Sequence, residues 1–164
     1  MAACSLPMDI IWNIRMASSI GCIPHGLHNV EVCEYLALKN EFSDWVITTA
    51  FYASLHLISS IIFPLEVRQA DNSIKTFNNV DDYKRSKGRS SPDKHTLICN
   101  IVLQKCQSDI ASKYKWLYDT CRTARYVNYQ QLPESAACAK TRMLAIKDYV
   151  LRQQQTNNKK SSKN

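Results

Sequence analysis

The sequence predicts an all-α protein, an antiparallel up-and-down helical bundle. Two observations predict this class. The 164 residues include only 3 glycines and 5 prolines, which disfavours the many turns of a β-sandwich or barrel. Apolar residues also recur at intervals of three and four along most of the chain, which is the period of a helix that buries one face. The length is that of one domain with a sizeable core, which we place at 1–155.

The stretch 45–65 predicts the central helix of this bundle. It has no charged residue between Asp44 and Glu66. Ser43 is expected to cap it, and Pro64 to end it because proline lacks an amide hydrogen. A membrane span is the first alternative for so long an uncharged run. The serine, threonine, tyrosine and histidine residues within it favour a buried helix of a soluble bundle instead.

The rest of the chain divides into further helices, one long loop and a tail. Residues 66–90 are polar, lack sustained periodicity and predict a long loop that can include a helical turn. A loop this long in a compact domain is usually functional or disordered. Residues 156–164 are polar and basic and predict a disordered tail. The other expected features are an extra N-terminal helix at Pro7–Ile20, a break at Pro24-His25-Gly26, and helices at Leu27–Phe42, from Ser91-Pro92 to about Cys106, from Ser108-Asp109 to about Asn128, and from Pro133 to about Gln154.

Charge is unevenly distributed between the two halves. Residues 1–82 hold 4 Lys/Arg against 9 Asp/Glu, a net charge of −5, whereas residues 83–164 hold 17 against 5, a net charge of +12. Such asymmetry favours an acidic partner for the second half, most simply nucleic acid. The alternative is a basic, solvated surface with a basic tail.

Several classes of site are excluded by missing motifs. The chain has no glycine-rich phosphate loop, no G-x-S-x-G elbow and no H-E-x-x-H, which removes P-loop enzymes, Rossmann dehydrogenases and zinc proteases. The seven cysteines form no C-x-x-C pair, and the chain does not open on a signal peptide. We therefore expect free thiols, a cytoplasmic location, and neither a metal nor a cofactor.

The stretch KYKWLYDTCRTARYVNY carries the candidate binding residues. Its helical spacing places five side chains on one face: Tyr118, Arg122, Arg125, Tyr126 and Tyr129. Guanidinium groups grip phosphate oxygens and tyrosine rings stack on bases, so this face suits nucleic acid. In the alternative interpretation the arginines pair with carboxylates such as Asp119 and the tyrosines belong to the core.

A cleft would form if the central helix packed its polar stripe against this face. Tyr52 and His56 would then lie near Arg122 and Tyr126, and His95 could reach the same cleft. Nearby guanidinium groups disfavour a cationic imidazole. A neutral imidazole can take the proton of a ribose 2′-hydroxyl while arginine stabilises the charged phosphorane, and this chemistry needs no metal.

Three stretches resemble the HEPN family of small helical-bundle proteins: DWVITTAFYASLHLISSII at 44–62, PDKHTLI at 92–98 and YKWLYDTCRTARYVNY at 114–129. The resemblance spans about residues 27–150. It implies a bundle that often dimerises and that acts in toxin–antitoxin, CRISPR or antiviral systems, either as a metal-independent ribonuclease or as a non-catalytic binding module. Ribonuclease members carry an arginine followed four to six residues later by a histidine on the late helix. No histidine follows His95 in this chain, and the literal match, Arg89 to His95, precedes that helix.

Three hypotheses follow for function. In the first, a HEPN-like module binds RNA or a nucleotide within a defence or toxin-related assembly, as a homo-oligomer or with a partner protein, and uses Arg122, Arg125 and Tyr126 for the anion. Tyr52, Tyr129 and Arg89 would add further contacts. In the second, the chain is an endoribonuclease whose base is His95 or His56 and whose phosphate-stabilising group is Arg122. In the third, the arginine and tyrosine face is a protein interface of a structural subunit.

Overall fold

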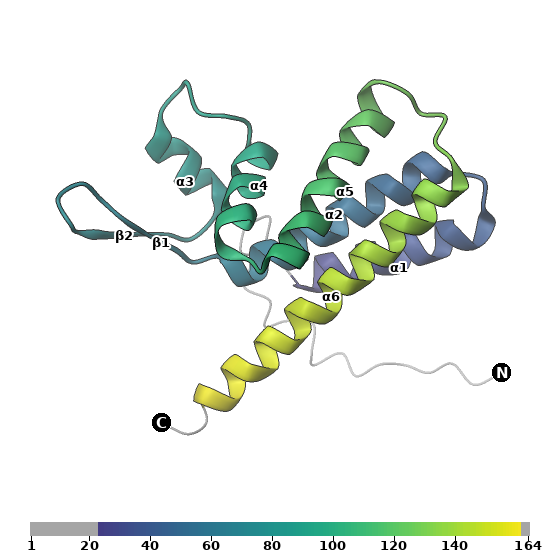
Figure 1. The fold of residues 1–164 in the computed structure, drawn as a ribbon. Coiled ribbons are helices and arrows are strands. Elements are labelled where there is room, and N and C mark those ends of the chain that lie inside the picture. The colour runs from purple at the N-terminus through teal and green to yellow at the C-terminus, as the bar shows by residue number, and fades with distance from the viewer. Residues whose placement is uncertain (1–22, 162–164) are drawn as a thin grey trace, which may run out of the picture.

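A computed structural model of the chain describes the backbone of residues 23–161 and the side chains of residues 23–156. The elements in order are α1 (Ile23–Lys39), α2 (Ser43–Ile62), β1 (Leu65–Arg68), β2 (Ile74–Phe77), α3 (Val80–Lys87), α4 (Lys94–Lys105), α5 (Ser108–Tyr126) and α6 (Pro133–Ser161). The all-α prediction is confirmed, because the described chain is a helical bundle with one short hairpin (Figure 1). The helix predicted at Pro7–Ile20 lies outside the described residues.

Helix α2 is the centre of the bundle. It packs against α1, α4, α5 and α6, and it is buried along nearly its whole length. It is the one helix of the described residues that is long and apolar enough to cross a membrane, and 72% of its most apolar window is buried inside the protein. This burial is that of the central helix of a bundle, the interpretation that the polar residues within the run favoured.

Three predicted helix starts differ from the structure. Phe42 rather than Ser43 precedes α2, and no side chain caps that helix. Helix α5 likewise begins at Ser108 after Gln107, without a side-chain cap. Helix α4 begins at Lys94, not at Pro92, because the carboxylate of Asp93 accepts hydrogen bonds from the first free backbone amides of the helix.

The predicted break at Pro24-His25-Gly26 is wrong. Helix α1 starts at Ile23, so Pro24 lies in the first turn, where its missing amide hydrogen costs no intrahelical bond. Gly26 is buried against α2, and a Cβ built on it would lie 2.7 Å from Cγ of Leu57. The glycine therefore serves the close approach of α1 to α2 rather than a turn.

The prediction for 66–90 is wrong about the hairpin, which it did not include, whereas the helical turn that it allowed is found as α3. Residues Leu65–Arg68 and Ile74–Phe77 form an antiparallel hairpin, and α3 follows it. The turn is held by Asp71, whose carboxylate accepts hydrogen bonds from the amide and hydroxyl of Ser73. The hairpin projects from the bundle beside α3 (Figure 1).

Helix α6 reaches into the stretch 156–164, for which the sequence predicts a disordered tail. Helix α6 continues without a break to Ser161, about two turns beyond Gln154. Glutamine and lysine are good helix formers, and here they extend a helix that the packed residues before them have already nucleated. The single domain predicted for 1–155 is described from residue 23 onwards.

Candidate functional site

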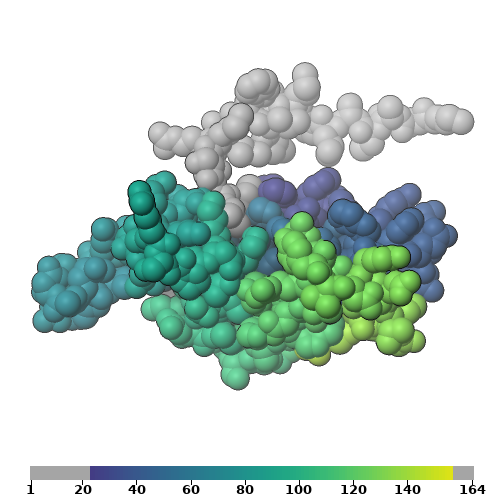
Figure 2. All heavy atoms as spheres, turned by 90° about the horizontal axis from the view of Figure 1, so that it is seen from above, coloured from purple at the N-terminus to yellow at the C-terminus, as the bar shows by residue number. Residues whose placement is uncertain are grey.

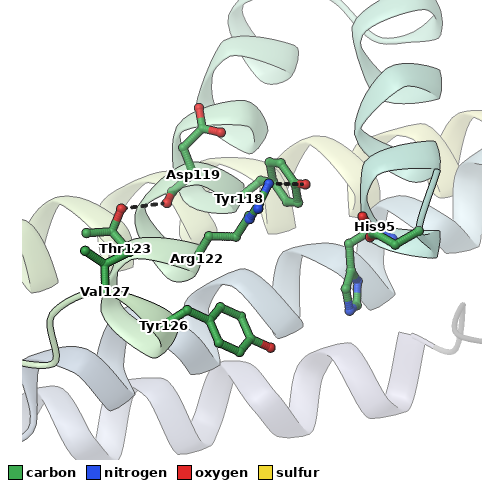
Figure 3. A pocket seen from close by; sticks show the side chains of 8 residues that line it. His95, Tyr118, Asp119, Arg122, Thr123, Tyr126 and Val127 are labelled. Atoms are coloured by element: carbon green, nitrogen blue, oxygen red, sulfur yellow. Dashed lines mark hydrogen bonds between the residues drawn. The ribbon is translucent and has the colours of Figure 1, made fainter.

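An open cavity of about 670 Å³ lies between the start of α4 and the last two turns of α5. It is lined by Asp93, His95, Tyr118, Asp119, Arg122, Thr123, Tyr126 and Val127. We call it the α4–α5 groove. The His95 ring, the Tyr126 ring and the Arg122 side chain converge on it from different sides (Figure 3). Two segments far apart in the sequence thus supply one site.

His95 is positioned by the capped first turn of α4. Its ring is half-buried, 5.7 Å from the ring of Phe51 and 5.9 Å from that of Tyr52. Burial lowers the pKa of His95, and the charge of Arg125 lowers it further, against the opposing effect of Asp93. Its Nδ1 is buried and has no hydrogen-bond partner within residues 23–156, and the residue lines the groove. The lowered pKa favours the neutral form of the imidazole.

Arg122 is held by a chain of hydrogen bonds that crosses from α5 to α4. Its guanidinium donates to the Tyr118 hydroxyl at 3.2 Å, and that hydroxyl lies 2.8 Å from Oγ1 of Thr96. Oγ1 of Thr96 in turn donates to the Asp93 carboxylate at 2.6 Å. If each hydroxyl donates onward, every group in the chain is satisfied and each bond polarises the next. The guanidinium remains exposed and points into the groove (Figure 3).

Arg125 is held from a second direction, by α2. Its Nη1 donates a 2.6 Å hydrogen bond to the hydroxyl of Tyr52. The guanidinium lies 5.7 Å from the ring centre of Tyr52 and 5.3 Å from that of Tyr126, within the range of cation–π attraction. Arg125 thus stands behind the groove, close enough to His95 to lower its pKa.

Neither arginine is neutralised by a salt bridge within the described residues. Asp119, the predicted partner, instead forms an ion pair with Lys115. Partial burial raises the pKa of Asp93, but hydrogen bonds from Thr96 and from the backbone amide of His95 outweigh it, so the net pKa is lowered. Asp93 is therefore a carboxylate already engaged with α4 and with the hydrogen-bond chain. Both guanidinium groups keep donors free for an added anion.

Five predicted site residues do not line the groove: Arg125 and Tyr52, which lie behind it, and His56, Tyr129 and Arg89, which lie apart from it. His56 is buried, and its ring stacks on that of His25 at a centroid distance of 3.8 Å. Tyr129 follows the end of α5 and is 71% exposed, and Arg89 lies in the segment after α3. The groove is therefore lined by one histidine and one arginine, His95 and Arg122, with Arg125 behind it and without the predicted His56.

Sequence reasoning did not identify Asp93 and Thr96 as parts of the site. A signal for Asp93 exists, because aspartate directly before a helical stretch is a preferred cap. No sequence pattern marks Thr96 as a residue of the site. Its role depends on the neighbouring helix bringing Tyr118 to it.

The described residues contain no group of three histidine, cysteine or acidic side chains that could hold a metal ion. Cys33, Cys99, Cys106, Cys121 and Cys138 are free thiols, as predicted. Burial raises the pKa of Cys33 and of Cys121 to about 11, so these two are not activated nucleophiles.

Comparison with protein-family models, with curated proteins and with solved structures found no match for this chain. Function must therefore be inferred from the groove itself.

Proposed function

We propose that this protein is an RNA- or nucleotide-binding module of the HEPN type, and that the α4–α5 groove is its binding site. The observation that carries the proposal is the pair of guanidinium groups, Arg122 and Arg125. Tyrosine hydroxyls fix Arg122 in the lining of the groove and Arg125 behind it, and neither has an acidic salt-bridge partner among residues 23–156. Arginines fixed in this way lose little entropy on gripping a phosphate.

The remaining lining of the groove suits a nucleoside. The ring of Tyr126 is 73% exposed beside the arginines, where it can stack on a base. Nε2 of His95 and the hydroxyl of Thr123 are polar groups that can bond to the sugar or to the edge of a base. The stretches that resemble the HEPN family form α2, the start of α4 and most of α5, and these three elements build the site. The resemblance also suggests that the module acts within a defence or toxin-related assembly.

A second candidate function is endoribonuclease activity, which the state of His95 favours. A neutral imidazole beside a guanidinium can accept the 2′-hydroxyl proton at Nε2. The 2′-oxygen then attacks phosphorus, the 5′-oxygen leaves and takes a proton from water, and Arg122 stabilises the phosphorane. The products would be a 2′,3′-cyclic phosphate and a 5′-hydroxyl end.

Binding and cleavage are separated by one set of assays. Labelled single-stranded RNA and adenosine 5′-monophosphate are titrated against the full chain, and the RNA is also incubated in EDTA and resolved on a gel. We expect binding of both ligands, weakened about tenfold or more by Arg122→Ala, which removes a charge-assisted phosphate contact. Arg152→Ala, an exposed arginine on α6, is the matched control and should bind like the wild type.

Each outcome selects one hypothesis. Binding without cleavage supports the module. Cleavage that is lost in His95→Ala, with binding retained, supports the enzyme. Absence of RNA and nucleotide binding, together with salt-insensitive association with another protein, would contradict the proposal and favour a protein interface.

A further inference from the structure

A second groove lies on the other side of α4, and the proposed function does not use it. This α3–α4 groove has a volume of about 350 Å³, and its lining includes Tyr83, Lys87, Ser90, Ser91, Asn100 and Gln104. Its walls combine apolar side chains and one aromatic ring with two exposed amides, Asn100 and Gln104. Amides beside apolar walls are what an unstacked base requires, because its faces are apolar and its edges form hydrogen bonds.

The hydroxyl of Ser91 gives this groove an unused polar group. Its oxygen is buried and has no hydrogen-bond partner among the side chains and backbone of residues 23–156. A buried hydroxyl without a partner carries a desolvation cost that a bound ligand can offset.

The α3–α4 groove has one basic lining residue, Lys87, and further basic residues adjoin it in sequence. The last turn of α3 holds Lys84, Arg85 and Lys87, and Arg89 follows it. Arg85 forms an ion pair with Asp82, but Lys84, Lys87 and Arg89 have no acidic partner within the described part of the chain. The ammonium group of Lys87 lies 5.1 Å from the ring centre of Tyr83, at the mouth of the groove. We call Lys84, Lys87 and Arg89 the α3 cations.

The two grooves adjoin at the start of α4. Residues 90–92 line the α3–α4 groove, and Asp93 and His95 line the α4–α5 groove. Because five residues span at most about 17 Å, Ser90 and His95 cannot lie farther apart than that. Figure 1 places the end of α3, the start of α4 and the end of α5 at one side of the molecule, and Figure 2 looks onto that side.

From this juxtaposition we propose that one strand of single-stranded RNA occupies both grooves. It crosses the start of α4, with one nucleotide at Arg122 and Tyr126, a second base in the α3–α4 groove, and phosphates on the α3 cations. This inference rests on the proposed function, because it extends the same site. For comparison, one OB fold covers about 4 to 16 nucleotides of a single strand.

The test compares affinity with strand length. Fluorescent oligouridylates of about 2 and about 12 nucleotides are titrated against the full chain at several salt concentrations. We expect the longer strand to bind more tightly and with a steeper salt dependence. The triple variant Lys84→Gln/Lys87→Gln/Arg89→Gln should remove most of this gain while leaving the affinity for the short strand within about twofold. Its salt slope for the long strand should fall by about 2, at ~0.7 for each phosphate that the variant no longer neutralises.

A matched control removes three exposed cations elsewhere: Lys39→Gln/Lys105→Gln/Arg152→Gln. It should keep the length-dependent gain. If both triple variants lose the gain equally, net charge explains it and the path over α4 is wrong, although the groove function stands. If the wild type binds neither strand, the proposed function fails, and the inference fails with it.

The proposed binding of a base in the α3–α4 groove is tested separately. Asn100→Ala/Gln104→Ala should weaken the long strand and not the short one, with no change in salt slope because no charge is lost. A duplex RNA of equal length should bind more weakly than the single strand, since its bases are already stacked and paired. Equal binding of duplex and single strand would overturn the assignment of a base to the α3–α4 groove.

Discussion

The guanidinium of Arg125 donates a 2.6 Å hydrogen bond to the hydroxyl of Tyr52, a residue 73 positions earlier in the chain. This contact fixes the end of α5 to the first half of α2. It also sets where the positive charge of Arg125 stands relative to His95, whose ring lies 5.9 Å from that of Tyr52. The central helix therefore acts in the site by holding an arginine rather than by supplying the base.

Tyr52→Phe removes this hydrogen bond and keeps the aromatic ring. We expect nucleotide affinity to fall about two- to tenfold, which corresponds to roughly 0.4–1.4 kcal/mol, because Arg125 loses its anchor but keeps its charge. Arg125→Ala should weaken binding more. The double variant should bind like Arg125→Ala alone, since the two changes remove one shared interaction. Tyr35→Phe on α1 is the control, and a loss of the same size there would contradict the assignment.

The titration of His95 can be followed by NMR on the full chain. Its midpoint should lie below 6.5, because burial and Arg125 disfavour the charged ring. Arg125→Gln should raise the midpoint. Asp93→Asn should lower it, since asparagine still caps α4 but no longer stabilises the cation. An unchanged midpoint in Arg125→Gln would show that the guanidinium does not face the imidazole.

The free energy of unfolding should change with pH over the range in which His95 titrates. A histidine whose pKa is lowered by folding binds protons more readily in the unfolded chain. The contribution of His95 to the free energy of unfolding is therefore fully present above its unfolded pKa of about 6.5 and is lost as the pH falls through the folded value. Denaturant unfolding of wild type and His95→Gln over this range should show a shallower pH dependence in the variant.

Long periodic stretches were predictable from the sequence, and short elements were not. The uncharged run before Pro64 predicts α2, a helix of more than five turns. By contrast, β1 and β2 span four residues each and α3 spans eight, and these elements depend on a few buried anchors, Leu65, Phe77 and Val80. So few apolar residues in a polar stretch give no period that a sequence window can detect.

The sequence predicts the arginines of the candidate site correctly. Of the two candidate histidines, it places only His95 correctly. The spacing on α5 identifies Arg122, Arg125 and Tyr126 directly. His56 follows Tyr52 by four residues, so it lies about 6 Å farther along α2 and is rotated by about 40°. That shift turns it from the α5 side towards α1, where it meets His25. The spacing of residues along a helix does not tell which neighbouring helix a given side chain will contact, because that depends on the tertiary packing.

Gly26→Ala should destabilise the protein. An added Cβ would lie 2.7 Å from Cγ of Leu57 and 3.2 Å from its backbone nitrogen, and Leu57 is fully buried. We expect the overpacking cost of about 1–3 kcal/mol to exceed the helix-propensity gain of up to about 1 kcal/mol. Adding Leu57→Ala should relieve the clash, so that the double variant loses less than the sum of the two single losses. Strict additivity would contradict the contact.

Tyr114→Phe should stabilise the protein. The ring of Tyr114 is fully buried among the core residues of α5, and its hydroxyl has no hydrogen-bond partner among residues 23–156. Burial also raises the pKa of this hydroxyl well above its ordinary value. Removing it abolishes the desolvation cost of about 1–3 kcal/mol without creating a cavity larger than one oxygen atom.

The measurement is thermal unfolding beside a matched variant, Tyr118→Phe. A gain of about 1 kcal/mol should raise the melting temperature of Tyr114→Phe by roughly 2–4 °C. Tyr118→Phe should instead lower it, because that hydroxyl links Arg122 to Thr96 and its loss leaves Thr96 short of a partner. The opposite signs distinguish a general preference for phenylalanine from the environment of each hydroxyl. A lower melting temperature for Tyr114→Phe would mean that a buried water satisfies Tyr114, and the core of α5 would then be polar at that point.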